Sequence, residues 1–110
     1  MPATIDGTTG IDAAAFTRNG VPVVLGGRVS GTGANTYSSP GVSTARNSVG
    51  DFTVTHGRNS IESTPVVTVE STQAFIACVY DRSLNSFSYR IRNASGTLTD
   101  GAASWLLIIP

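Results

Sequence analysis

The sequence predicts an all-β fold, a small antiparallel β-sandwich or jelly roll with an extended N-terminal arm. Val and Ile number 18 against five Leu, and 14 Thr add to the β-branched residues. Such side chains lose rotamer freedom in a helix and pack well on a pleated sheet. Twelve Gly and five Pro also interrupt the 110 residues too often for helices of ordinary length. No window carries the apolar i, i+3, i+4, i+7 pattern of a helix.

Residues 1–41 are expected to form the arm. They are low in charge, rich in Gly and Thr, and only weakly periodic. Pro22 lacks an amide donor, so the apolar run 21–25 is expected at a sheet edge or in an extended segment. Residues 28–39 carry turn formers throughout and are expected to form a loop. The apolar residues expected to anchor the arm are Ile5, Ile11, Phe16, Val23 and Leu25.

Residues 42–110 are expected to form the sandwich, which we call the knob. Turn residues separate short alternating or apolar runs every eight to fifteen positions, and this spacing predicts six strands. The expected strands are 42–47, 52–56, 65–69, 74–80, 87–92 and 102–110. Two of them, 74–80 and 102–110, are apolar on both faces, which predicts that both of their sides are covered.

These two strands predict self-association. A sandwich of about 70 residues has one interior, so a strand apolar on both faces leaves its outer side uncovered. A large exposed apolar patch usually marks an interface. We therefore expect a homo-oligomer, packed through one of the two strands. Alternatively, the arm folds back over that face, and both arrangements can hold together. The expected interface residues are Phe75, Ala77, Val79, Trp105, Leu106, Leu107, Ile108 and Ile109.

Charge and composition exclude several classes of function. Seven Arg balance two Glu and five Asp, and there is no Lys. A chain of zero net charge is not expected to bind nucleic acid electrostatically. No apolar run reaches the roughly 18 residues of a membrane-spanning helix, so no membrane association is expected. One Cys and one His hardly permit a zinc site, and the spacing of a calcium-binding EF-hand loop is absent. We expect neither metal nor cofactor.

No catalytic arrangement is evident either, and the chain is not expected to be an enzyme. His56 shares a strand face with Phe52 and Val54, which favours a core-edge or interface residue over a general base. Cys78 stands among apolar residues and is expected to be a small buried hydrophobe. The nucleophile elbow, the phosphate-binding loop and the dinucleotide fingerprint are all missing.

The arginines offer a candidate binding face. Arg90 and Arg92 share the outward face of one expected strand, and Arg82 precedes them across a turn. Guanidinium groups suit planar, bidentate contacts with carboxylates. These residues could form a polar face for acidic sugars or for a partner protein. The alternative is a solvated strand face whose arginines pair with Glu70 or Asp81.

Several segments together resemble a known family. They are Val49-Gly50-Asp51-Phe52-Thr53-Val54-Thr55, Pro65-Val66-Val67-Thr68-Val69, Phe87-Ser88-Tyr89-Arg90-Ile91 and the Trp-bearing apolar C-terminal strand. This pattern resembles the C-terminal β-sandwich of bacteriophage tail fibres and tailspikes, whose fold is similar to that of the trimeric H-type lectins. The opening residues 4–11 also resemble segments of phage fibre proteins. The chain departs from the family at His56, where an aromatic residue is common, and in the short stretch of some 40 residues before the sandwich.

The resemblance implies a homotrimeric knob on the virion surface. The arm would attach it to a larger tail or capsid protein, and the knob would bind host-surface carbohydrate as a tail-fibre adhesin. A capsid decoration protein, acting as cement or head spike, is the alternative, and a free-standing H-type-like lectin is a further one. The shortness of the chain favours decoration, whereas the sandwich pattern favours the adhesin. The sugar-contacting residues of the lectins do not map onto identifiable positions in this sequence.

Overall fold

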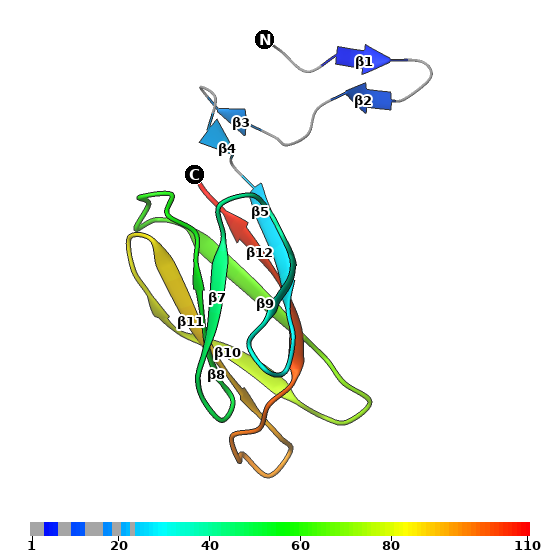
Figure 1. Ribbon diagram of the computed structural model, residues 1–110, viewed down its shortest axis with the longest axis vertical. Helices are drawn as coiled ribbons and strands as arrows, with labels where there is room; N and C mark the ends of the chain where they lie inside the picture. The colour runs from blue at the N-terminus through cyan, green and yellow to red at the C-terminus, as the bar shows by residue number, and fades with distance from the viewer. Residues whose placement is uncertain (1–3, 7–9, 13–16, 19–20, 23) are drawn as a thin grey trace.

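The computed structural model describes residues 4–6, 10–12, 17–18, 21–22 and 24–110 of the chain. Its main body consists of two four-stranded antiparallel sheets, which pack against each other as a sandwich (Figure 1). No helix occurs among the described residues. The predicted all-β fold is therefore confirmed.

One sheet has the strand order β10-β11-β8-β7, and we call it the front sheet. Its strands are β7 (Ser43–Ser48), β8 (Asp51–Thr55), β10 (Ile76–Arg82) and β11 (Ser86–Arg92). Alternation along β8 and β11 places Phe52 opposite Tyr89 on the inner face and Asp51 opposite Arg90 on the outer face. The front sheet thus has an apolar side and a polar side.

The other sheet has the order β6-β5-β12-β9, and we call it the back sheet. Its strands are β5 (Val24–Val29), β6 (Asn35–Ser38), β9 (Thr64–Glu70) and β12 (Ala102–Ile108). The C-terminal strand β12 lies between β5 and β9 and pairs with both along its length. It is therefore an interior strand.

The core lies between the two sheets and is built around aromatic contacts. Phe52 stacks on Tyr89 with ring centroids 5.3 Å apart. Phe87 of the front sheet meets Trp105 of the back sheet edge-on at 5.6 Å, which joins the two layers. The buried hydrophobic residues are Leu25, Val29, Phe52, Val54, Phe87, Tyr89, Ile91, Ala103, Trp105, Leu107 and Ile109.

All six strands predicted within residues 42–110 are present, with boundaries shifted by one or two residues. The predicted boundary between arm and knob at residue 41 is wrong, because β5 and β6 belong to the sandwich. Residues 28–39, expected as a loop, contain the end of β5 and all of β6. Leu25, expected in the arm, is 1% exposed and belongs to the core. The sandwich therefore begins at Val24.

Four short strands precede the sandwich and form two hairpins of their own. They are β1 (Thr4–Asp6), β2 (Gly10–Asp12), β3 (Thr17–Arg18) and β4 (Val21–Pro22). β1 pairs with β2, with Ile5 directly opposite Ile11, and β3 pairs with β4. The other two predicted anchor residues before β5, Phe16 and Val23, lie outside the described residues.

A β-bulge in strand β10 shapes the outer face of the front sheet. The register with β11 shifts between Val79 and Asp81, which leaves Tyr80 as the extra residue. Val79 faces Tyr89, whereas Asp81 faces Ser88, an outer-face position. A bulge of this kind re-aims side chains. The bulge thus brings both Tyr80 and Asp81 toward the outer, polar side of the sheet.

Candidate functional site

The outer face of the front sheet carries a cluster of polar side chains around Asp51, which is 8% exposed. The Tyr80 hydroxyl donates to Asp51 Oδ1 at 2.7 Å, and Asn47 Nδ2 donates to the same oxygen at 3.2 Å. Arg90 Nε donates to Asp51 Oδ2 at 3.4 Å. Three strands, β8, β10 and β11, and the end of β7 supply these four residues. We call them the Asp51 cluster.

Two further hydroxyl groups extend the cluster across the sheet. Asn47 Nδ2 also donates to Thr53 Oγ1 at 2.8 Å, and Thr53 Oγ1 lies 2.8 Å from Ser88 Oγ. Alternation places Asp51 and Thr53 on the same side of β8, and Ser88 and Arg90 on the same side of β11. The polar face is therefore continuous over at least two neighbouring rungs of the sheet.

The guanidinium group of Arg90 is held in place from two sides. Its Cζ lies 4.0 Å from the centroid of the Tyr80 ring, a cation–π contact. Its Nε is directed at Asp51, while 40% of the side chain stays exposed. Within the part of the chain that the structure describes, its two terminal nitrogens make no hydrogen bond. They are available for an acceptor from outside the chain.

The electrostatics of the cluster keep Asp51 ionised. Burial raises the pKa of Asp51, but the hydrogen bonds from Tyr80, Asn47 and Arg90 lower it by more. The resulting pKa lies below the ordinary value of an aspartate. The hydrogen bond to Asp51, together with burial, raises the pKa of Tyr80, which stays a protonated donor. Asp51 is thus a buried anion that holds Tyr80 and Arg90.

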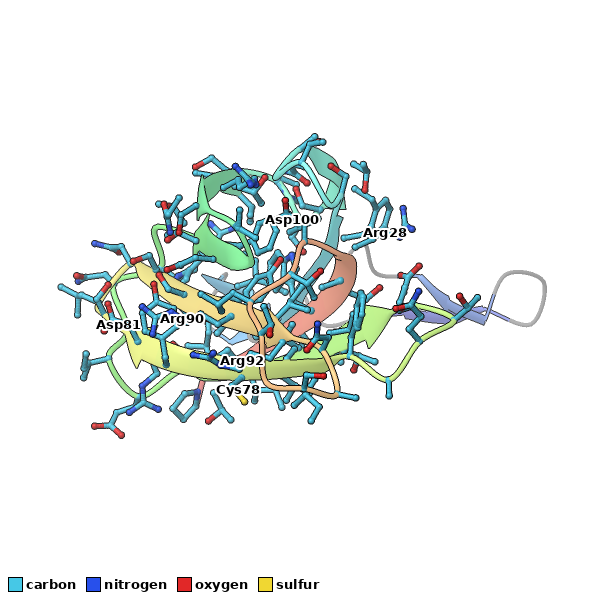
Figure 2. All side chains as sticks on the ribbon, turned by 90° about the horizontal axis from the view of Figure 1, so that it is seen from below. Arg28, Cys78, Asp81, Arg90, Arg92 and Asp100 are labelled. Carbon is cyan, nitrogen blue, oxygen red and sulfur yellow. The ribbon has the colours of Figure 1, made fainter. Side chains whose placement is uncertain are left out.

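The structure separates the three arginines predicted to form a ligand face. Arg90 and Arg92 lie two residues apart on the outer side of β11, next to Cys78 of β10, as Figure 2 shows. Arg92 Nη1 donates to the Gly96 carbonyl at 3.0 Å. Arg82 sits opposite the core residue Phe87 and donates to the Ser63 carbonyl at 3.0 Å, so it holds a loop.

The carboxylates that the sequence offered as partners of these arginines pair elsewhere. Glu70 binds Arg28 with two hydrogen bonds of 2.9 Å on the back sheet, and Asp81 forms no ion pair among the described residues. The carboxylate that holds Arg90 is Asp51, which was not among the partners expected from the sequence. Alternation through Phe52 and Val54 could have shown that Asp51 and Thr53 share the outer face.

The outer face of the back sheet carries exposed apolar side chains instead. Leu106 of β12 is 50% exposed and lies opposite Val66 of β9, which is 48% exposed. Two residues further along β12, Ile108 is 47% exposed and lies opposite Val24 of β5. We call these four residues the apolar patch. Beside it, a shallow groove of about 530 Å³ runs between Tyr37 and Leu106.

Glycine opens this groove. Gly26 stands opposite Leu106 on the outer face, and a Cβ at residue 26 would lie 3.2 Å from Leu106 Cδ2. The ion pair of Arg28 and Glu70 lies along the same face, and Ser104 Oγ donates to Glu70 Oε1 at 2.7 Å. The hydrogen bonds from Arg28 and Ser104 lower the pKa of Glu70 to about 2. The outer face of the back sheet is therefore apolar at one end and bears a paired charge at the other.

The predicted interface residues divide between the core and the surface. Trp105, Leu107 and Ile109 are buried within the chain's own core, because these alternate positions of β12 and the residue after it face inward. They are not available to a second chain. Leu106 and Ile108 are exposed on the opposite side. Phe75 and Ala77 are half-buried against the core, and Val79 is 37% exposed.

The two single residues considered for chemistry differ in burial. His56 is 1% exposed, and its Nδ1 accepts a hydrogen bond of 3.1 Å from the Arg58 amide. Its Nε2 is buried and has no partner among the described residues. Cys78, predicted to be buried, is exposed, because β10 is an edge strand and Cys78 lies opposite Arg90 on its outer side.

The described residues also define what the surface lacks. Among them, no group of three or more His, Cys, Asp or Glu side chains is placed to hold a metal ion. The same residues contain no helix long and apolar enough to cross a membrane. Comparison with protein-family models, with curated proteins and with solved structures gives no match to this chain. Among the described residues, the two outer faces of the sandwich, one polar and one apolar, are the candidate binding surfaces.

Proposed function

We propose that the chain is a non-enzymatic structural protein of a bacteriophage virion. In this proposal three copies form a surface knob that binds host-surface carbohydrate in the manner of a tail-fibre tip. The support is the resemblance of the strand motifs to tail-fibre sandwiches, together with the antiparallel sandwich itself. The observation that carries the assembly is the apolar patch on the back sheet.

The patch suits association between copies of this chain. Its four side chains are each 39–50% exposed and come from the three strands β5, β9 and β12, so they form one continuous surface. Exposed apolar surface gains about 25 cal/mol for each Å² removed from water. A small sandwich with one core gains further stability when such a face is covered. In the trimer, the three back sheets face one another and the three front sheets face outward.

This arrangement leaves the Asp51 cluster free to bind a ligand. The cluster and the apolar patch lie on the outer faces of different sheets, with the core between them. Three copies of one polar face, held by one rigid assembly, would bind a repetitive surface far more tightly than one copy, by about 10²–10⁴-fold when the geometry fits. Weak recognition of single sugar units would thus suffice for adhesion.

A non-enzymatic role agrees with the surroundings of the single histidine. His56 is buried, and one ring nitrogen accepts a backbone hydrogen bond from Arg58. A general base has to reach a substrate proton, and a nucleophile has to stand within hydrogen-bond distance of the base. No such pair of side chains includes His56 among the described residues.

The oligomeric state tests the assembly. Analytical ultracentrifugation of the full chain is expected to give a trimer, and Leu106→Asp is expected to give a monomer that remains folded by circular dichroism. Ile76→Asp is the matched control, because Ile76 is 59% exposed on the outer side of the front sheet. A monomeric wild-type chain would contradict the proposal. If Ile76→Asp dissociates the trimer and Leu106→Asp leaves it intact, the interface lies on the front sheet, which would contradict the proposed assembly.

The position on the particle tests the role. Antibody labelling of virions in the electron microscope is expected to place the chain on the tail. Label over the head would favour a capsid decoration protein over the adhesin. If the antibody labels no part of the particle, both roles are contradicted. The trimer test and the labelling test are independent, since either result can be obtained without the other.

A further inference from the structure

We propose that the exposed terminal nitrogens of Arg90, held by Tyr80 and Asp51, bind the oxyanion of an acidic sugar on the outer face of the front sheet. This inference rests on the proposed adhesive function and names the class of ligand. The oxyanion is either the carboxylate of a uronic acid or the phosphate of a phosphorylated sugar. Both present two oxygens with the spacing of a guanidinium fork.

The orientation of Arg90 is the first step of the argument. An arginine free in solvent loses rotamer entropy when it binds, which weakens the complex. Here the ring of Tyr80, 4.0 Å from Cζ, and the Oδ2 atom of Asp51, 3.4 Å from Nε, already fix the guanidinium plane. The bulge in β10 makes this contact, because it places Tyr80 on the outer face. The fork is therefore preorganised for a ligand.

The charge of the site is the second step. Asp51 is engaged by three donors and only 12% of its side chain is exposed, whereas 40% of the Arg90 side chain is exposed. The negative charge of Asp51 thus lies beneath the surface, and the positive charge of Arg90 lies at it. A second guanidinium group, that of Arg92, lies two residues along the same face and has one backbone acceptor, Gly96. An approaching anion meets two cations first.

One carboxylate opposes this field, and it provides a useful variant. Asp81 lies opposite Ser88 on the outer side, one rung from Arg90, and is exposed. Because like charges repel, Asp81 is expected to weaken the binding of any anion at Arg90. Removal of its charge should therefore strengthen binding, whereas removal of the Arg90 fork should weaken it. Unfolding would weaken binding in both variants, so stronger binding after the loss of the Asp81 charge cannot result from unfolding.

The ligand is tested by nuclear magnetic resonance of the full-length ¹⁵N-labelled chain, with the Nε–H signal of Arg90 as the direct readout. Glucuronate and glucose 6-phosphate are the acidic probes, and glucose is the neutral one. We expect saturable shifts of the Arg90 signal with at least one acidic probe and none with glucose. The tighter acidic probe identifies the source of the oxyanion. Equal shifts with glucose, or no shift with either acidic probe, would overturn the inference.

Variants separate recognition from charge. Arg90→Lys keeps the charge but loses the fork, and is expected to weaken acidic-probe binding about tenfold or more, because an ammonium group cannot reproduce the two parallel hydrogen bonds of a guanidinium. Asp81→Asn is expected to strengthen it. Arg46→Lys is the matched control, since it is the same exchange at an arginine that pairs with Asp100, outside the cluster. Binding that Arg90→Lys leaves unchanged, or that Arg46→Lys weakens equally, would contradict the proposal.

A glycan array distinguishes failure of this inference from failure of the proposed function. The immobilised array carries neutral and acidic oligosaccharides, and the full-length wild-type chain is the sample. Binding to acidic glycans that Arg90→Lys removes supports the inference. Binding to neutral glycans alone overturns the acidic site and leaves adhesion standing. Binding to no glycan contradicts both carbohydrate adhesion and the acidic site.

Discussion

Gly27 of β5 lies directly opposite Trp105 of β12, and the absence of a side chain at Gly27 makes room for the indole. A Cβ at residue 27 would lie 2.8 Å from Trp105 Nε1 and 2.6 Å from the Tyr37 carbonyl oxygen. The indole in turn meets Phe87 of the front sheet edge-on. A glycine in a strand interior often marks such a close approach. Gly27 therefore permits the contact that joins the two sheets.

The first prediction follows from this contact. Gly27→Ala is expected to lower the free energy of unfolding by about 1–3 kcal/mol, because the added methyl group forces Trp105 or the backbone of β6 to move. Gly31→Ala is the matched control, since the nearest atoms to a Cβ there lie 3.7 Å away. Urea unfolding measures both variants. Equal midpoints for the two would show that the core accommodates a side chain at residue 27.

The second prediction compares two tyrosine hydroxyl groups. The Tyr89 hydroxyl is buried without a partner among the described residues, whereas the Tyr80 hydroxyl donates to Asp51. Tyr89→Phe is expected to leave the free energy of unfolding unchanged or to raise it, because an unsatisfied buried polar group is costly. Tyr80→Phe is expected to lower it by about 1 kcal/mol, since a bond to a charged acceptor is lost. The reverse order in thermal unfolding would contradict this assignment of partners.

Much of the fold could be predicted from local pattern. Alternation in segments such as 52–56 and 87–92 depends on one apolar and one polar face, and the structure has both strands as expected. Strand β5 escaped prediction because Gly26 and Gly27 remove the apolar alternation that marks a strand. The glycines are there for long-range reasons: one opens the groove on the outer face, and the other makes room for Trp105.

The candidate site shows the same limit. Arg90 and Arg92 were found because they alternate with core residues, but the partner of Arg90 could not be named. Asp51 follows Gly50, whose φ of 67° is typical of a turn. A Gly-Asp pair is expected in a turn, so the sequence did not indicate that Asp51 is the first residue of β8. Tyr80 reaches Arg90 through a bulge, a register shift that no local pattern announces. The contact of Asp51 with Arg90 joins strands distant in sequence, and the contact of Tyr80 with Arg90 depends on a register shift between neighbouring strands.

The third prediction concerns acid. Burial and the nearby charge of Arg58 lower the pKa of His56 below its ordinary value of 6.5. Below about pH 6.5, His56 therefore binds a proton more readily in the unfolded chain than in the folded chain. The free energy of unfolding falls as the pH drops through this range. At pH 5.5 the loss is at most about 1.4 kcal/mol. His56 is the single histidine of the chain, which isolates the effect.

Urea midpoints at pH 7.5, 6.5 and 5.5 measure this dependence. We expect a declining series for the wild-type chain and a flat series for His56→Gln, whose side-chain oxygen is able to accept the Arg58 amide hydrogen bond. A wild-type midpoint that stays constant over this range would show that folding leaves the pKa of His56 unchanged. A decline that persists in His56→Gln would assign the effect to another group.

The last prediction locates the start of the sandwich. A chain without residues 1–22 retains all eight strands of the two sheets, since the first of them, β5, begins at Val24. A chain without residues 1–27 loses Val24 to Gly27 of that strand, including the buried Leu25, whose burial alone is worth about 1.5–3 kcal/mol. Because β5 is an interior strand, its loss also leaves the backbone groups of β6 and β12 unpaired. We expect cooperative thermal unfolding from the first chain and none from the second. Folding of both would make β5 dispensable, and unfolding of both would show that the sandwich needs residues 1–22.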